Sequence, residues 1–358
     1  MTRMIRSRRR RHSLLPAVFL PAAAAACLAL LAGAAPANAQ LVIQAQFDST
    51  ITSDPNASEI EATINAGIAQ IENTVTNSLT VQITYSEGGG LGESSTFYDN
   101  VSYTSFRAAL AAETPTAIKT QALASLPNTT GNPVNDNADI TVAEANAAIL
   151  GLDSTVNGTN IGTVTLNTSI CNLTRTSIDP TKYDLESVAM HETDEMLGIG
   201  GAGSELNYVD EGGQGLSDPP GPLDLYRYSA SGVRSYTISS SSTAYFSVNG
   251  GVTDINGFNQ NGMTDGSDFG DWATSATPHV QDAYATPGVI VNLGTPEYDM
   301  YQAVGWNLSS SLLTPAPGPL SVAGTCIFMA GCPAWLRRLR RRPVRPPLPA
   351  SPPKTGER

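Results

Sequence analysis

Apolar and polar residues alternate with two different periods in the first part of this chain. Leu41–Phe47 and Leu79–Tyr85 alternate with a period of about two, which predicts a strand in each segment. Between them, four isoleucines recur at intervals of three or four residues. This spacing places them on one face of a helix, so we expect a helix over residues 56–75 that buries this face.

The rest of the chain up to residue 310 combines helical and extended patterns. We expect helices over residues 103–112, 117–126, 141–150, 184–197 and 296–305, and strands over residues 161–170, 235–238 and 243–248. A strand, a helix and a strand, followed by a long helix and irregular polar structure, indicate an α+β fold. We expect one domain over residues 40–310, with a cleft between its N-terminal part, 40–198, and its C-terminal part, 199–310.

The N-terminal segment has the pattern of an export signal. Six arginines and no acid accompany the apolar run Leu14–Leu31, and Ala37-Asn38-Ala39 follows as a small-residue cleavage site. This pattern predicts a signal peptide over residues 1–39. An uncleaved membrane anchor is the alternative, which Pro16 and Pro21 disfavour.

The C-terminal segment begins with prolines, has no charge from Leu320 to Leu336 and then carries an arginine cluster over residues 337–342. This order resembles the bacterial PEP-CTERM sorting signal. We therefore expect a sorting segment over residues 311–342, transient membrane contact through it and the signal peptide, and a secreted or cell-surface bacterial protein. A simple anchor is the alternative. Residues 343–358 are rich in proline and predict a disordered tail.

The charge of the whole chain hides a strongly acidic domain. The 358 residues have a formal net charge of −12, but residues 40–336 contain six basic and 31 acidic residues, a net charge of −25. A surface this acidic repels a phosphate backbone, which excludes nucleic-acid binding. Cys171 is the only cysteine between residues 40 and 310. Stability must therefore come from the core and from bound cations rather than from a disulfide framework.

One of the two histidines of this domain lies in a pattern that can bind a metal ion. His191 and Glu195 are four residues apart on a predicted helix, so they share a face about one turn apart. This is the spacing of a helical His-Glu-x-x-His zinc motif with Glu in place of the second His, and a carboxylate also binds Zn²⁺. Glu192 would then be the general base toward a water molecule. The alternative is an amphipathic helix with an ordinary solvated acidic edge.

A third ligand must come from outside this helix. In the metzincin pattern the third His would fall at Gly201, which has no side chain to offer. We prefer Asp224 because its apolar and aromatic neighbours imply structured surroundings; a capping or Arg-paired aspartate is the alternative. Tyr226 or Tyr228 could supply an oxyanion-stabilising hydroxyl. The other candidate acids are Glu205, Asp210, Glu211 and Asp218.

A second group of acids follows in the C-terminal part. Asp265, Asp268 and Asp271 alternate with glycine and serine, as in a loop that binds Ca²⁺ through oxygen ligands. The spacing is not that of an EF-hand, so solvated acids in tight turns are the favoured alternative. A structural Ca²⁺ ion is the corresponding expectation.

Five segments resemble a family of secreted bacterial PEP-CTERM proteins that are zincin-like metalloproteases with a His-Glu-x-x-Glu helix. The segments are residues 191–198, 223–229, 245–251, 270–272 and 299–306. The resemblance implies a zincin-like fold with a small mixed sheet, an active-site helix and an irregular, strand-rich C-terminal half. It also implies metalloprotease activity with His191 and Glu195 as ligands and Glu192 as the base.

The sequence therefore predicts an exported, zincin-like metalloendopeptidase that acts on protein or peptide substrates. A Zn²⁺ ion would be held by His191, Glu195 and Asp224. The alternative is a non-enzymatic surface or matrix protein that binds Ca²⁺ or polysaccharide. A glycosidase that uses Glu192 and Asp224 as paired carboxylates is a weaker idea, since no cluster of tryptophans for sugar stacking accompanies them.

Overall fold

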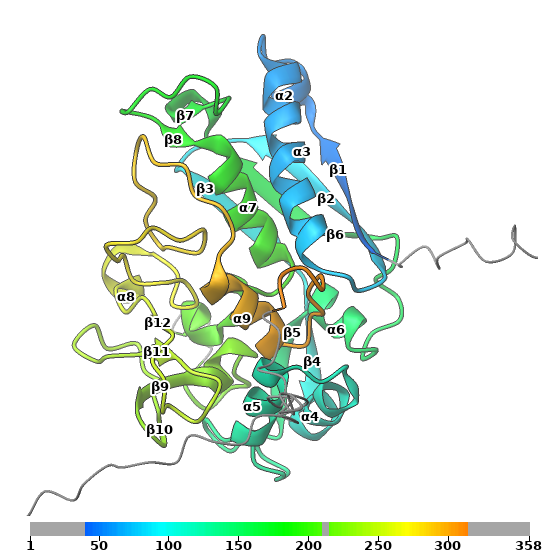
Figure 1. Ribbon diagram of the computed structural model, residues 1–358, viewed down its shortest axis with the longest axis vertical. Helices are drawn as coiled ribbons and strands as arrows, with labels where there is room; N and C mark the ends of the chain where they lie inside the picture. The colour runs from blue at the N-terminus through cyan, green and yellow to red at the C-terminus, as the bar shows by residue number, and fades with distance from the viewer. Residues whose placement is uncertain (1–39, 210–214, 314–358) are drawn as a thin grey trace, which may run out of the picture. The chain divides into compact units, whose positions relative to one another are not determined.

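The computed structural model describes residues 40–209 and 215–313 (Figure 1). The predicted signal peptide, the tail and the sorting segment beyond residue 313 lie outside the described residues, as do the candidate ligands Asp210 and Glu211. The described residues belong to one unit of the chain. None of their helices is both long and apolar enough to cross a membrane.

A four-stranded mixed sheet forms the N-terminal part. Its order is β1 (Leu41–Phe47), β2 (Leu79–Glu87), β6 (Asn160–Leu166) and β3 (Gly92–Thr96). β1, β2 and β6 run parallel, and β3 pairs antiparallel with β6 at the edge of the sheet. Every second residue of β2 up to Tyr85 is buried, because the period-two pattern turns its apolar side chains toward one face. The strands predicted for β1 and β2 are confirmed.

Two helices pack side by side against this sheet, α3 (Ala57–Thr74) and α7 (Leu185–Met196) (Figure 1). The four isoleucines of α3 are almost completely buried, as their spacing predicts. α7 is preceded by Asp184, whose side chain accepts a hydrogen bond from the backbone of Ser187 and so caps the helix. Both helices were predicted from the sequence, and their packing fixes where the face of α7 with His191 points.

The other elements before α7 were predicted only in part. They are α2 (Ser49–Thr52), β4 (Tyr98–Ser102), α4 (Tyr103–Ala112), α5 (Ala117–Ser125), β5 (Asp139–Ala143), α6 (Glu144–Ile149), β7 (Cys171–Asn172) and β8 (Tyr183–Asp184). α4 and α5 confirm the helices predicted over residues 103–112 and 117–126. The helix predicted over 141–150 is wrong at its start, because Asp139–Ala143 pairs with β4 as an antiparallel strand. β3 and β4 were not predicted.

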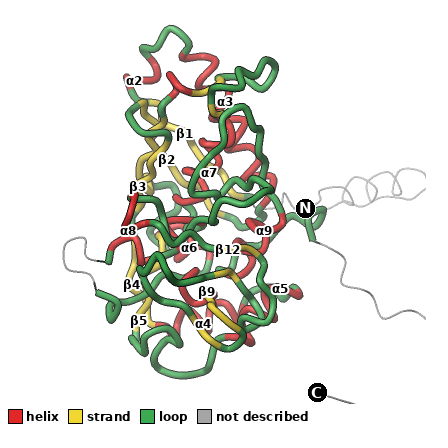
Figure 2. Tube along the Cα trace, turned by 90° about the vertical axis from the view of Figure 1, so that its left-hand side faces the viewer, coloured by secondary structure: helices red, strands yellow, loops and turns green. Residues whose placement is uncertain are grey.

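Short strands and long connections make up the C-terminal half (Figure 2). Its elements are β9 (Arg227–Ala230), β10 (Val233–Arg234), β11 (Tyr245–Phe246), β12 (Asn256–Gly257), α8 (Gly262–Asp265) and α9 (Thr295–Ala303). The strand predicted over 235–238 is wrong, since this segment has no regular structure. α9 confirms the last predicted helix. The chain is thus an α+β protein with small sheets and several helices, as its sequence indicates.

A buried arginine stabilises one connection that matters for the site. The guanidinium of Arg227 donates to the backbone oxygens of Phe269 and Asn259, at 2.5 and 2.8 Å. It also lies over the ring of Phe258, with 4.6 Å between its central carbon and the ring centroid. These contacts fix the backbone of the loop that precedes Asp271, so the side chain of Asp271 is held in place from the C-terminal half.

Candidate metal centre

A cleft of about 470 Å³ lies along the face of α7 that carries His191. β3 and the residues just before it line one part of the cleft, and segments around residues 266–271 and 278–291 line another. His191, Glu192 and Glu195 of α7 all contribute to its wall. The cleft thus brings together the predicted catalytic helix and the C-terminal half of the domain.

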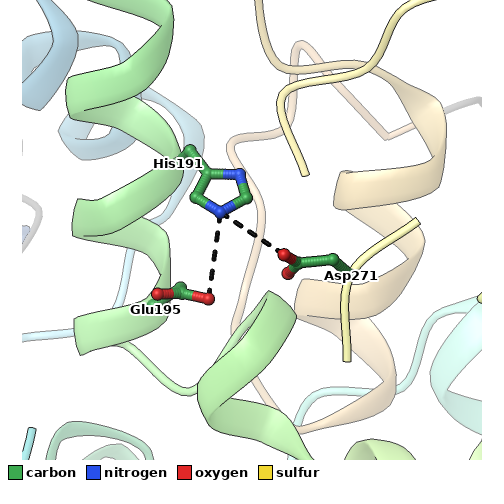
Figure 3. A group of neighbouring side chains, drawn as sticks. All are labelled: His191, Glu195 and Asp271. Atoms are coloured by element: carbon green, nitrogen blue, oxygen red, sulfur yellow. Dashed lines mark ion pairs between the residues drawn. The ribbon is translucent and has the colours of Figure 1, made fainter. Parts of the chain in front are cut away.

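Three side chains converge in this cleft: His191, Glu195 and Asp271 (Figure 3). The His191 Nε2 atom lies 3.5 Å from Asp271 Oδ2 and 3.9 Å from Glu195 Oε1. One ligand atom of each residue lies within 4.8 Å of the other two. Two ligands of one tetrahedral Zn²⁺, each about 2.0–2.2 Å from the metal, are about 3.3–3.6 Å apart. The group could therefore hold a metal ion after small side-chain movements.

The orientation of His191 suits a metal ligand. Its Nδ1 atom lies 2.8 Å from the backbone oxygen of Val280. A carbonyl oxygen can only accept, so Nδ1 carries the hydrogen of this bond. In the neutral ring the lone pair is then on Nε2, the atom that faces the two acids. A backbone carbonyl that fixes the tautomer in this way is the usual outer support of a histidine ligand.

The two acids of the group each have a buried oxygen that lacks a hydrogen-bond partner among the described residues. Ser94 of β3 donates to Glu195 Oε2 at 2.7 Å, which leaves Glu195 Oε1 unpartnered beside His191. Asp271 is 2% exposed, and its Oδ1 is also unpartnered. An unpaired buried carboxylate oxygen is costly, and a cation would remove this cost. The donor set of one nitrogen and two carboxylates therefore fits a divalent ion.

Gly201 explains why a histidine does not take the third position of the metzincin pattern. A Cβ atom built on Gly201 would lie 2.2 Å from Glu195 Oε1 and 2.7 Å from Asp268 Oδ2. Any side chain at this position would displace the carboxylate that replaces the second histidine. The third residue of the group, Asp271, comes instead from the loop after Asp268, which approaches the helix from the other side.

Glu192 lies next to the group, 6% exposed, and lines the cleft. Its carboxylate reaches toward β3, where a Cβ atom at position 92 would be 2.2 Å from Glu192 Oε1. Gly92 is therefore the residue that leaves room for this side chain. Glu192 is held between α7 and the edge strand, beside the three grouped residues but not among them.

Burial and mutual repulsion shift the ionisation of these groups. Burial and the charge of Glu195 raise the pKa of Glu192 and of Asp271 well above the usual range of a carboxyl. Burial opposes a charge on His191, but the neighbouring acids Glu192 and Glu195 outweigh it and raise its pKa to about 9. Without a metal ion, protons therefore stabilise the cluster.

Asp224 is not in this group, so the structure does not bring together the third ligand preferred from the sequence. It is 1% exposed, and its carboxylate accepts hydrogen bonds from Ser204 Oγ and from the backbone of Glu205 and Gly221, at 2.6, 2.9 and 2.8 Å. All these donors stabilise the turn of the chain after α7. Asp224 therefore holds two segments of backbone together through its carboxylate. Glu205 and Asp218 are not in the group either.

The other sequence candidates are also distributed differently from what was expected. Tyr226 and Tyr228 are buried in the C-terminal core, whereas Tyr98 and Tyr208 line the cleft with their hydroxyl oxygens 3.2 Å apart. Asp265 accepts hydrogen bonds from the backbone and side chain of Ser267. Of the three acids proposed for a Ca²⁺ loop, Asp271 is the one in the metal group of the described residues.

Asp271 was considered for a Ca²⁺ loop but not for the zinc site. The signal that could have found it is the Gly-Asp-Trp segment of the family resemblance. Ser94 and Val280, which orient Glu195 and His191, had no signal of their own. No protein-family model, curated protein or solved structure matches the chain.

Proposed function

We propose that the chain is an exported, zinc-dependent endopeptidase with a zincin-like arrangement. The observation that carries the proposal is the convergence of His191, Glu195 and Asp271 in a cleft, with Glu192 beside them. A mixed sheet with α7 packed against it supports the zincin-like arrangement that the sequence resemblance implies.

His191, Glu195 and Asp271 would hold the ion. Three protein ligands of nitrogen and oxygen are typical of catalytic zinc sites, which keep a further position open. When bound, such an ion lowers the pKa of water and polarises a carbonyl oxygen. Ser94 and the Val280 carbonyl orient the ligands Glu195 and His191, so the ligand geometry is set before an ion arrives.

Glu192 would transfer the proton during hydrolysis. As a carboxylate it accepts a proton from a water molecule, whose oxygen forms a bond to the carbonyl carbon of the peptide. As the bond between that carbon and the amide nitrogen breaks, Glu192 delivers the same proton to the leaving amine. The raised pKa that burial gives Glu192 suits a group that must both accept and donate at neutral pH.

The position of β3 supports a peptide as the substrate. β3 is at the edge of its sheet and lines the cleft, so an extended peptide could lie alongside it by strand addition. The hydroxyls of Tyr98 and Tyr208 are in the same cleft and could donate to a developing oxyanion. Both features would place a peptide bond near Glu192.

The test is to compare metal content and peptide hydrolysis in the purified chain and in Glu192→Gln. We expect about one bound zinc ion in both proteins and a loss of hydrolysis of at least about 1,000-fold in the variant, since the base is removed but the ligands remain. Glu59→Gln, at an exposed position outside the cleft, is the matched control. Full activity of Glu192→Gln would refute the mechanism. No activity in any protein, with stability that rises in millimolar Ca²⁺ only, would favour the matrix protein.

A further inference from the structure

The walls of the cleft are predominantly acidic. Among the described residues, seven carboxylates and no lysine or arginine line it. Glu195 and Asp271 belong to the metal group, Glu192 is the proposed base, and Asp184 forms an ion pair with Arg175 at 2.5 Å. The other three carboxylates that line the cleft are those of Glu93, Asp268 and Asp282.

The basic residues of the domain compensate only one of these acids. Among the six lysines and arginines of the described residues, Arg175 pairs with Asp184, the other five donate hydrogen bonds outside the cleft, and none lines the cleft. A divalent ion would balance only the two acids that bind it. The cleft would thus keep a negative potential next to the site of hydrolysis, and a concave wall of one sign attracts ligands of the other.

Asp282 is the most buried of these three acids. It is 7% exposed, and its Oδ2 accepts a hydrogen bond from the backbone of His279 at 3.0 Å. Its Oδ1 is buried and has no hydrogen-bond partner among the described residues. Asp282 also forms a β-bridge with Trp272, the residue after Asp271, so it is fixed relative to the metal group. Asp282 Oδ1 is therefore a hydrogen-bond acceptor in a fixed position that has no donor among the described residues.

We propose that the cleft selects peptides with a lysine or arginine side chain next to the bond that is cleaved. Asp282 would accept from the ammonium or guanidinium group, and Glu93 and Asp268 would add to the attraction. Tyr284, which is 41% exposed and lines the same cleft, offers a ring to a guanidinium group. The inference rests on the proposed endopeptidase function, since it names the substrate class of that site.

The experiment uses fluorogenic peptides that differ at one residue beside the cleaved bond, on either side. Arginine, its neutral isostere citrulline and glutamate occupy that position in turn. We expect kcat/KM to be at least tenfold higher for the arginine peptide than for the citrulline peptide, and lowest for glutamate. Asp282→Asn should reduce the ratio of arginine to citrulline to below threefold. Asp254→Asn, at an exposed position outside the cleft, should leave the ratio unchanged.

Equal kcat/KM for the arginine and citrulline peptides would overturn the inference and leave the proposed function intact. If no peptide is cleaved, the proposed function fails. Binding of the labelled peptides to the zinc-loaded chain, measured by fluorescence anisotropy, then tests the selection on its own. Tighter binding of arginine than of citrulline would support the selection, and equal binding would overturn it. If Asp282→Asn does not fold, two other experiments replace it: the variant Asp268→Asn, and the unchanged protein in added salt. The ratio of kcat/KM for arginine to citrulline must fall in both, because the variant removes a negative charge and added salt screens charge pairs.

Discussion

Replacing Asp271 and Asp224 by alanine in turn separates the two candidates for the third ligand. Both side chains are almost completely buried, so the two substitutions remove a similar volume from similar surroundings. Asp271 Oδ2 lies 3.5 Å from His191 Nε2, and Asp271 Oδ1 has no hydrogen-bond partner among the described residues. Asp224, by contrast, accepts three hydrogen bonds from the chain. We expect Asp271→Ala to weaken zinc binding and Asp224→Ala to weaken folding.

The expected effect of Asp271→Ala follows from linkage. Zinc at about 100 times its Kd stabilises the folded protein by about 2.7 kcal/mol. Loss of a direct ligand should raise Kd by about 100-fold, since removal of residues that only support ligands already costs 10–100-fold. About 0.4 kcal/mol would then remain at the same zinc concentration. With about 2–4 °C per kcal/mol, the zinc-induced rise in Tm should fall from roughly 5–11 °C to about 1 °C.

Without zinc, Asp271→Ala should leave the stability unchanged or raise it. Burial and the charge of Glu195 raise the pKa of Asp271, so its ionised form is unfavourable in the folded state. The alanine variant removes this cost together with the side chain. A loss of stability that occurs with zinc but not without it distinguishes a ligand from a residue that merely packs.

Asp224→Ala should lower stability with and without zinc by the same amount. The substitution leaves two buried backbone N–H groups and one hydroxyl without an acceptor. Each orphaned group costs about 1–3 kcal/mol, and part is recovered because burial disfavours the charge of Asp224, so we expect roughly 2–4 kcal/mol. Thermal unfolding of both variants at fixed zinc concentrations measures these changes. A zinc-induced rise in Tm that is intact in Asp271→Ala and lost in Asp224→Ala would refute the assignment.

Two further predictions concern the surroundings of His191. Gln281 is fully buried and donates from Nε2 to the His191 oxygen and to Asp194 Oδ2, both at 3.3 Å, so Gln281→Met should raise the Kd for zinc about tenfold in a chelator competition assay. An unchanged Kd would show that these bonds do not position the site. The folded state raises the pKa of His191 from 6.5 to about 9, so stability of the metal-free protein falls as the pH rises through this window. Zinc affinity should rise over the same window because the proton must leave, and a flat titration between pH 6 and 9 would contradict this.

Local periodicity predicted the elements whose faces differ strongly in polarity. The isoleucines of α3 and the alternation in β2 turn an apolar face to the core, and this contrast is visible in a few consecutive residues. β3 has no such contrast. Gly92–Thr96 contains no apolar side chain, because the strand lines a polar cleft and provides space for Glu192 and a donor to Glu195. Because β3 forms the wall of a polar cleft, it lacks the alternation of apolar and polar residues that predicts a strand.

Some residues of the site could be predicted from local spacing, and others could not. His191 and Glu195 could be predicted because a helix alone fixes side chains four residues apart. Asp271 depends on contacts that no spacing rule contains: the hydrogen bonds of Arg227 to the preceding loop and the pairing of Trp272 with Gln281. The apolar neighbours of Asp224 indicated structured surroundings, and the side chain is buried. Burial did not say whether the carboxylate would meet backbone N–H groups or a histidine.

An acidic chain with so few basic residues must satisfy its buried carboxylates by other donors. Asp224 uses backbone N–H groups, Asp194 the hydroxyl of Tyr301, and Glu297 the indole of Trp272. Glu195 and Asp271 differ, because each leaves an oxygen unpartnered among the described residues while facing the same imidazole. A proton on His191 compensates part of this charge, and a divalent ion would compensate more of it. In the function and substrate class proposed above, this scarcity of lysine and arginine leaves the charge of the cleft to be balanced from outside the chain, first by a metal ion and then by a cationic substrate.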